Sequence, residues 1–142
     1  MKDRETKYWV LSASKDHVKN AVLEEIAQTC HGKASPLKRM KKGDYLIYYS
    51  GKQTLGKPEK CQQFTALGKV VDDDIFEFQV SEDFCPSRRK ISFFPSNDIS
   101  ILPLIDSLDF IEDKKNWGSP FRFGILEINR QDFSKISAQM MN

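Results

Sequence analysis

The stretch that decides the fold is GDYLIYYS, residues 43–50, where a glycine–aspartate turn leads straight into five apolar or aromatic side chains. A run of this kind after turn residues predicts a β-strand over 45–49. Alternate side chains of a strand point to opposite faces, so Tyr49 shares a face with Ile47 while Tyr48 points the other way. Tyr49 therefore fits a core position. For Tyr48 a core position and a ligand-stacking position remain equally open.

Outward from this strand, hydrophobic periodicity and turn residues define the other elements. Strands are expected at 7–13, 64–71, 75–80, 88–94 and 121–128, and helices after Ser14, at 100–108 and after Asn129. The first helix should fail near Gly32, a basic loop should cover 32–42, and strands 64–71 and 75–80 should form a hairpin. The pattern predicts an α+β fold in a single domain over 1–142. Its centre would be a mostly antiparallel, curled β-barrel of five to six strands, with about three flanking helices.

The composition is that of an ordinary globular protein of 142 residues, 39% hydrophobic and 30% charged. We expect no membrane span, because no apolar run is long enough, and no secretory signal, because Met1–Glu5 is charged and no apolar segment follows. The three cysteines are widely spaced and form no CxxC pair, which favours a reduced, cytoplasmic protein. Neither a metal nor a cofactor is expected, since close ligand pairs are missing.

Charge is segregated along the chain. Positions 33–60 carry eight basic residues against two acidic ones, whereas positions 72–83 carry six acidic residues and no basic one. A basic face would suit a polyanion such as nucleic acid. Charged runs are also common in solvated loops, so charge alone leaves both interpretations open.

A second stretch, NWGSPFRFG at 116–124, sets Trp117 and Phe121 beside small residues. Exposed or extruded bases are bound by aromatic stacking, polar groups at the base edge and cations on the backbone. The candidate base-pocket residues are Ser12, Ser14, Tyr48, Tyr49, Ser50, Trp117 and Phe121. The candidate phosphate contacts are Lys33, Lys38, Arg39, Arg88, Arg89 and Arg122. Arg122 could equally pair with an acidic loop, and Trp9, inside the first strand, is expected in the core.

Sequence motifs of the common enzyme classes are missing: there is no GxGxxG, GxxxxGK[ST], HExxH or GxSxG. The two histidines, His17 and His31, have no local partner pattern that would activate a cysteine. The sequence therefore favours a binding protein over an enzyme.

Several short motifs, taken in order, strongly resemble the EVE domain family of small bacterial proteins, and the resemblance covers nearly the whole chain. They are Tyr8-Trp9-Val10, Asp16-His17-Val18, residues 28–33 and 36–40, Gly43-Asp44, Tyr48-Tyr49-Ser50, Phe64-Thr65-Ala66, residues 86–89, Trp117-Gly118, Phe121-Arg122 and Asp132-Phe133.

This resemblance implies a PUA-like barrel related to YTH domains, which recognise methylated adenine in RNA. It also implies a pocket for a modified base, such as a cytosine derivative in DNA or a modified RNA base. The YTH cage relies on tryptophans, and here Trp117 is available, with Tyr48, Tyr49 and Phe121 as substitutes. The partner would be nucleic acid, bound by a monomer that acts alone or delivers the base to a separate nuclease or RNA-processing protein.

Two other functions remain open. The related ASCH group includes amidohydrolases acting on acetylcytidine through a lysine, a threonine and a glutamate, for which Lys33, Thr65 and Glu77 or Glu127 are the candidates here. The third possibility is an interaction or oligomerisation module whose aromatic side chains are buried against another chain.

Overall fold

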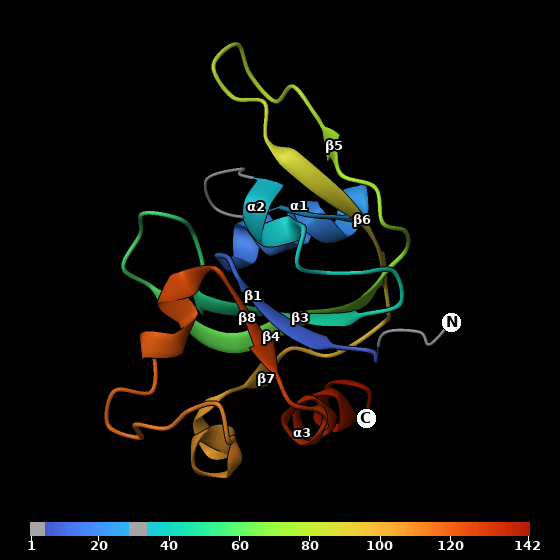
Figure 1. Ribbon diagram of the computed structural model, residues 1–142. Coiled ribbons are helices and arrows are strands. Elements are labelled where there is room, and N and C mark those ends of the chain that lie inside the picture. Colours follow the sequence, from blue (N-terminus) through green and yellow to red (C-terminus); the bar gives the residue numbers. More distant parts are fainter. Residues whose placement is uncertain (1–4, 29–33) are drawn as a thin grey trace.

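A curled mixed β-sheet forms the centre of the molecule, which the computed structural model describes over residues 5–28 and 34–142 (Figure 1). Its strands are β1 (Tyr8–Ser12), β2 (Ile26–Ala27), β3 (Tyr45–Lys52), β4 (Lys60–Val70), β5 (Phe76–Glu77), β6 (Ser87–Phe93), β7 (Ile99–Ser100) and β8 (Ile125–Ile128). The helices are α1 (Lys15–Glu24), α2 (Ala34–Leu37) and α3 (Arg130–Met140), with 3₁₀ helices η1 (Leu102–Ser107) and η2 (Ser119–Phe123). None of them, within the described ranges, is both long and apolar enough to cross a bilayer.

The main sheet runs in the order β2-β6-β4-β3-β1-β8, with β5 paired to β6 and β7 paired to β4. All of these pairs are antiparallel except β1 with β3, which are parallel and are connected by a segment that contains α1, β2 and α2. Three of the eight strands have only two residues, so five longer strands carry the sheet. The predicted α+β class and its curled, mostly antiparallel sheet are confirmed.

The turn before β3 is tied to β1 by one buried carboxylate. Asp44 is only 1% exposed and accepts hydrogen bonds from the Trp9 indole (2.9 Å), the Lys7 backbone N–H (3.0 Å) and the Lys41 backbone N–H (2.9 Å). A buried carboxylate is costly unless its oxygens are satisfied, and here both oxygens have donors. The Gly43-Asp44 motif therefore fixes the register of β1 against β3.

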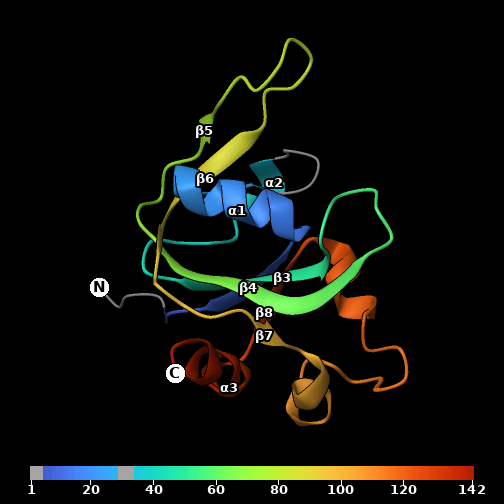
Figure 2. The same ribbon diagram turned by 180° about the vertical axis from the view of Figure 1, so that it is seen from behind.

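Two apolar cores lie on the two faces of this sheet. One lies beneath α1 and α2 and contains Trp9 and Tyr48, and the other lies against η1 and α3 and contains Tyr49 and Phe133. Figure 2 shows α1 and α2 on one side of the sheet, and α3 with the yellow-brown turn of η1 on the other. The alternation of Tyr48 and Tyr49 predicted from the sequence therefore places them in different cores.

Several predicted elements were wrong in extent or pairing. The first helix ends at Glu24, the left-handed φ of 58° at its C-cap Glu25 closes it, and Ile26 enters β2. Ser14 occupies the N-cap position but makes no capping hydrogen bond, whereas Asn129 accepts from the Asp132 N–H at 2.7 Å as expected of a cap. The basic loop at 32–42 contains the short helix α2; residues 29–33, with the predicted helix end at Gly32, lie outside the described residues.

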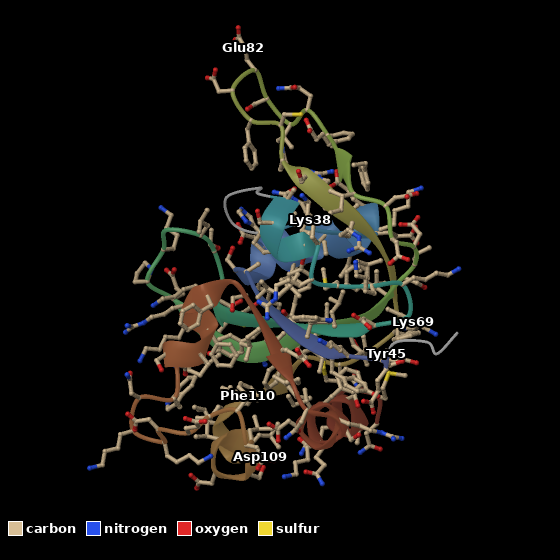
Figure 3. The ribbon with its side chains drawn as sticks, in the orientation of Figure 1. Lys38, Tyr45, Lys69, Glu82, Asp109 and Phe110 are labelled. Carbon is tan, nitrogen blue, oxygen red and sulfur yellow. The ribbon has the colours of Figure 1, made fainter. Side chains whose placement is uncertain are left out.

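The predicted hairpin of 64–71 with 75–80 was also wrong, because β4 pairs with β6 instead. Only two residues of 75–80 form a strand, and β5 and β6 are joined by an arm that projects beyond the sheet, with Glu82 at its tip (Figure 3). The helix predicted at 100–108 is the 3₁₀ helix η1. The strand predicted at 121–128 begins only at Ile125, because η2 and Gly124, with a φ of 76°, come first.

Candidate functional site

A pocket of about 570 Å³ opens where the end of β1, the β3–β4 loop (residues 53–59) and η2 meet. In Figures 1 and 2 the green β3–β4 loop and the orange η2 lie side by side at one edge of the molecule. The described residues that line the pocket are Ser12, Ala13, Ser14, Tyr49, Gly51, Lys52, Leu55, Gly56, Lys60, Gln62, Lys115, Asn116, Trp117, Gly118, Phe121 and Arg122.

Aromatic rings form one wall of this pocket. Tyr49 and Phe121 stack with their centroids 4.0 Å apart and their planes 17° from parallel, and Phe110 meets Phe121 edge-on at 5.8 Å. Carbon atoms in contact lie about 3.5–4 Å apart, so a third ring between two others would need roughly 7 Å. No flat ligand fits between Tyr49 and Phe121 as they stand. Trp117, half-buried in the same pocket, is the ring left for a planar ligand.

Tyr49 is the buried base of that wall. It is 5% exposed, and it also makes an edge-on contact with Phe64, with the ring centroids 5.6 Å apart. Burial raises the pKa of the Tyr49 hydroxyl far above the ordinary value for tyrosine, because the phenolate would lose its hydration. Tyr49 therefore supplies a neutral, apolar surface at neutral pH.

The rim of the pocket is cationic. Lys52, Lys60, Lys115 and Arg122 are exposed and line it, and none of the described lining residues is a carboxylate. Lys52 Nζ donates to the Pro58 carbonyl at 3.3 Å, which keeps its charge along the β3–β4 loop. Cations from two segments distant in sequence thus surround an aromatic wall.

Polar groups that could contact a base edge come from three elements. Ser12 and Ser14 lie at the end of β1 and the start of α1, Asn116 precedes η2, and Gln62 lies in β4. Gln62 has a left-handed φ of 55°, uncommon outside glycine, and its carbonyl accepts from the Ile101 N–H at 3.0 Å. The Ser14 hydroxyl lowers the pKa of the Asp16 carboxyl, so that carboxyl stays charged at neutral pH.

Five of the seven predicted base-pocket residues line this pocket together: Ser12, Ser14, Tyr49, Trp117 and Phe121. The other two lie elsewhere. Ser50 is fully buried, and its hydroxyl is 2.8 Å from the Thr65 hydroxyl. Tyr48, on the opposite face of β3, lines a second pocket of about 280 Å³, and its hydroxyl accepts from the Gln28 N–H at 3.4 Å.

Of the predicted phosphate contacts that the structure describes, Arg122 alone is among the pocket-lining residues. Arg88 is 7% exposed in the second pocket, where it pairs with Glu24 at 3.2 Å, donates to the Gln28 side chain at 2.8 Å and lies over the Phe78 ring. Arg89 is 1% exposed and donates to the carbonyls of Leu37 and Met40, both at 2.7 Å.

Burial lowers the pKa of the Arg89 guanidinium from its ordinary value, and the nearby Asp73 and Asp72 oppose that shift. Arg39 lies over the Trp9 ring at 4.9 Å. Lys38 is exposed just after α2 (Figure 3). Lys33 lies outside the described residues.

The described residues considered for a hydrolase, which exclude Lys33, do not gather in this pocket. Thr65 bonds Ser50 inside the sheet, Glu77 lies on β5, and Glu127 pairs with Lys7 on the outer edge at 3.6 Å. Across residues 5–28 and 34–142 no three His, Cys, Asp or Glu side chains come together as a metal site would require.

Sequence reasoning missed Leu55, Gln62, Lys115 and Asn116 as pocket residues. Lys52 and Lys60 were counted only as part of a basic segment. A signal was present for Lys115 and Asn116, which directly precede Trp117 in the chain. Gln62 gave none, because its position depends on a bulge where β4 bends to meet β7.

A model of the EVE domain family matches residues 7–139. The chain belongs to the EVE domain family. The UPF0310 protein in the gntR 5′ region of Bacillus licheniformis is 46% identical over 128 residues, which cover 90% of this chain and 87% of that protein.

Two solved structures show the same fold as this EVE domain at low sequence identity. The YTH domain of Zygosaccharomyces rouxii MRB1 in complex with N6-methyladenosine RNA aligns with a TM-score of 0.63 at 14% identity, covering 99% of this chain and 90% of that one. Human THYN1 in complex with 5-methylcytosine-containing DNA aligns with a TM-score of 0.50 at 14% identity, covering 96% and 99%. The predicted family is confirmed, and the chain shares its fold with a YTH domain.

Proposed function

We propose that this EVE domain binds nucleic acid and holds one modified base in the pocket between the β3–β4 loop and η2. The observation that carries the proposal is the composition of that pocket: a half-buried tryptophan, a stacked Tyr49–Phe121 wall and four cations with no described carboxylate among them. A stacking platform beside a cationic rim suits a base attached to a phosphate backbone.

Each group has a role in this proposal. Trp117 stacks on the base, and Tyr49 with Phe121 closes the inner wall against water. Ser12, Ser14, Gln62 and Asn116 hydrogen-bond the base edge. Lys52, Lys60, Lys115 and Arg122 contact the flanking phosphates, and such contacts would make the affinity fall steeply with salt.

The fold neighbours support a modified base as the ligand. One of them is described in complex with N6-methyladenosine RNA and the other with 5-methylcytosine-containing DNA. By that analogy we propose a methylated or otherwise modified base, with selectivity that rests on pocket shape. The domain would act in the cytoplasm as a monomeric recognition module, alone or with a separate nuclease or RNA-processing protein.

The experiment is a binding titration at two salt concentrations with single- and double-stranded oligonucleotides. Matched probes carry cytosine, 5-methylcytosine, 5-hydroxymethylcytosine or N6-methyladenine at one central position. Preferential, salt-sensitive binding of one modified probe is expected. Equal affinity for all probes would refute a base pocket, and no binding at all would refute nucleic acid as the partner.

A further inference from the structure

The β3–β4 loop ends in a tight turn that presents one apolar side chain to solvent. Lys57 N–H donates to the Thr54 carbonyl at 3.2 Å, and Gly56, the third residue of the turn, has a φ of 77°. That conformation is typical of a type II turn, which needs glycine at its third position. Leu55 is therefore the outer corner of the turn, and it is 64% exposed.

Hydrogen bonds hold this loop in place beside the pocket. The Gln53 carbonyl accepts from the Asp16 N–H of α1 at 3.0 Å, and the Gln53 N–H donates across the loop to the Glu59 carbonyl at 3.1 Å. The Gln53 side chain also donates to the Lys60 carbonyl at 3.3 Å. Leu55 is thus carried on a preformed support rather than on a free chain.

The surroundings of Leu55 distinguish it from other exposed apolar side chains. Leu23 on α1 is more exposed, at 81%, but it does not line the pocket, whereas Leu55 does. Lys52, Lys57 and Lys60 belong to the same loop or its ends, and all three are exposed. Leu55 is therefore an exposed apolar side chain at the mouth of the pocket, flanked by cations. This combination is complementary to a nucleic acid, which has charged phosphates outside and apolar stacked bases inside.

We propose that Leu55 is a wedge for double-stranded DNA, an inference that rests on the proposed function. The lysines hold the backbone, the modified base leaves the helix for the pocket, and Leu55 enters the gap that the base leaves in the stack. Apolar side chains inserted between base steps stabilise an opened duplex, whose unstacking is otherwise unfavourable. A single strand leaves no such gap. Binding to a duplex should therefore depend on Leu55 more strongly than binding to a single strand does.

The test compares wild-type protein, Leu55→Ala, Leu55→Met and the exposed control Leu23→Ala. The probes are the four duplexes of the titration above, their single strands, and duplexes with a mismatch at the modified position. 2-Aminopurine next to that position reports unstacking through its fluorescence. For Leu55→Ala we expect the ratio of duplex to single-strand dissociation constants to rise about tenfold, with a weaker fluorescence increase. Leu55→Met and the mismatched duplex should each restore most of the loss, and Leu23→Ala should match wild type.

Other outcomes separate the wedge from the pocket. If Leu55→Ala weakens duplex and single-strand binding by the same factor, Leu55 only lines the pocket; the wedge is then refuted and the proposed function stands. If wild-type protein prefers a modified single strand and opens no duplex, the wedge is refuted as well. If wild-type protein binds none of the probes, both proposals fail.

Discussion

Two neighbouring tyrosines of β3 face two different environments. The contrast distinguishes structural cations, whose charge is paired within the fold, from available cations, which are exposed at the pocket. On the Tyr48 side, Arg88 is enclosed by Glu24, Gln28 and Phe78, so its charge is used within the fold. On the Tyr49 side, the pocket is lined by four exposed cations and by no described carboxylate. The same residue types, aromatic and basic, therefore stabilise the protein on one face and remain available to a ligand on the other.

Exposure, rather than the number of charged or aromatic residues, distinguishes the proposed binding face. Arg89 and Arg122 show this most clearly: one is fully enclosed and bonded to backbone carbonyls, and the other is exposed at the pocket. Removing a structural cation should cost stability, while removing an available cation should cost affinity. The following substitutions test this division, beginning with the largest expected effect.

Arg89→Ala should lower the free energy of unfolding by about 3 kcal/mol or more, because the buried carbonyls of Leu37 and Met40 lose their donors. Chemical denaturation measures the change. The matched control is Arg122→Ala, an exposed site whose unfolding free energy should stay within about 0.5 kcal/mol of wild type. An Arg89→Ala protein as stable as wild type would contradict the structural role.

Trp117→Ala should weaken binding of the preferred oligonucleotide by about 1–3 kcal/mol, through loss of stacking. Trp117→Phe, which keeps a ring, should recover part of the affinity. Circular dichroism and thermal melting would establish that both variants are folded. A folded Trp117→Ala protein with wild-type affinity would remove this residue from the binding site.

A double substitution of Lys60 and Lys115 by alanine should flatten the salt dependence of binding. Each lost phosphate contact reduces the slope of log affinity against log salt by about 0.7–0.9. Titrations at several salt concentrations give the slope. Lys90→Ala on β6, an exposed lysine outside the pocket lining, is the control and should leave the slope unchanged. An unaltered slope in the double variant would place the phosphates elsewhere.

Tyr49→Phe should change the stability of the protein only in alkaline solution. Burial raises the pKa of Tyr49 above that of an exposed tyrosine, so the neutral hydroxyl is favoured in the folded state. Its contribution is fully present below the unfolded-state pKa, about 10, and is lost as the pH rises beyond it. Near pH 10.5 the wild-type protein should have lost about 1 kcal/mol more than Tyr49→Phe. Parallel alkaline denaturation curves for the two proteins would mean that Tyr49 is solvated.

Local patterns in the sequence predicted the longer strands β1, β3, β4 and β6 and the final helix well. The Gly43-Asp44 turn with its aromatic run gave β3, and Asn129 with Phe133, Ile136 and Met140 gave α3. The early end of α1 at Glu24 could not be predicted, because the Ile26–Ala27 segment is held by long-range pairing with β6. Sequence periodicity contains no record of a partner about sixty residues away.

Prediction of the candidate site had the same limit: local sequence identified some residues, but it did not contain the long-range contacts that place the others. Trp117 and Phe121 were found from their ring-rich context, but Arg88 and Arg89 looked identical in sequence to available cations. Their burial depends on β6 lying between β4 and β2, a pairing order that replaced the expected hairpin. Lys115 and Gln62 join the pocket only because η2 and the bulged β4 meet at the end of β1.

The most direct test of the binding face uses the two tryptophan indole N–H signals in a nitrogen-15 NMR spectrum of the protein. Trp9 donates its indole N–H to buried Asp44, and Trp117 lines the pocket, so the two signals report on the core and on the proposed binding site. Addition of the preferred modified oligonucleotide should shift the Trp117 signal and the backbone signals of Ser14 and Gly56, and leave Trp9 in place. Shifts at His17, Gln28 and Arg88 with an unmoved Trp117 signal would place the ligand on the Tyr48 side and contradict the account.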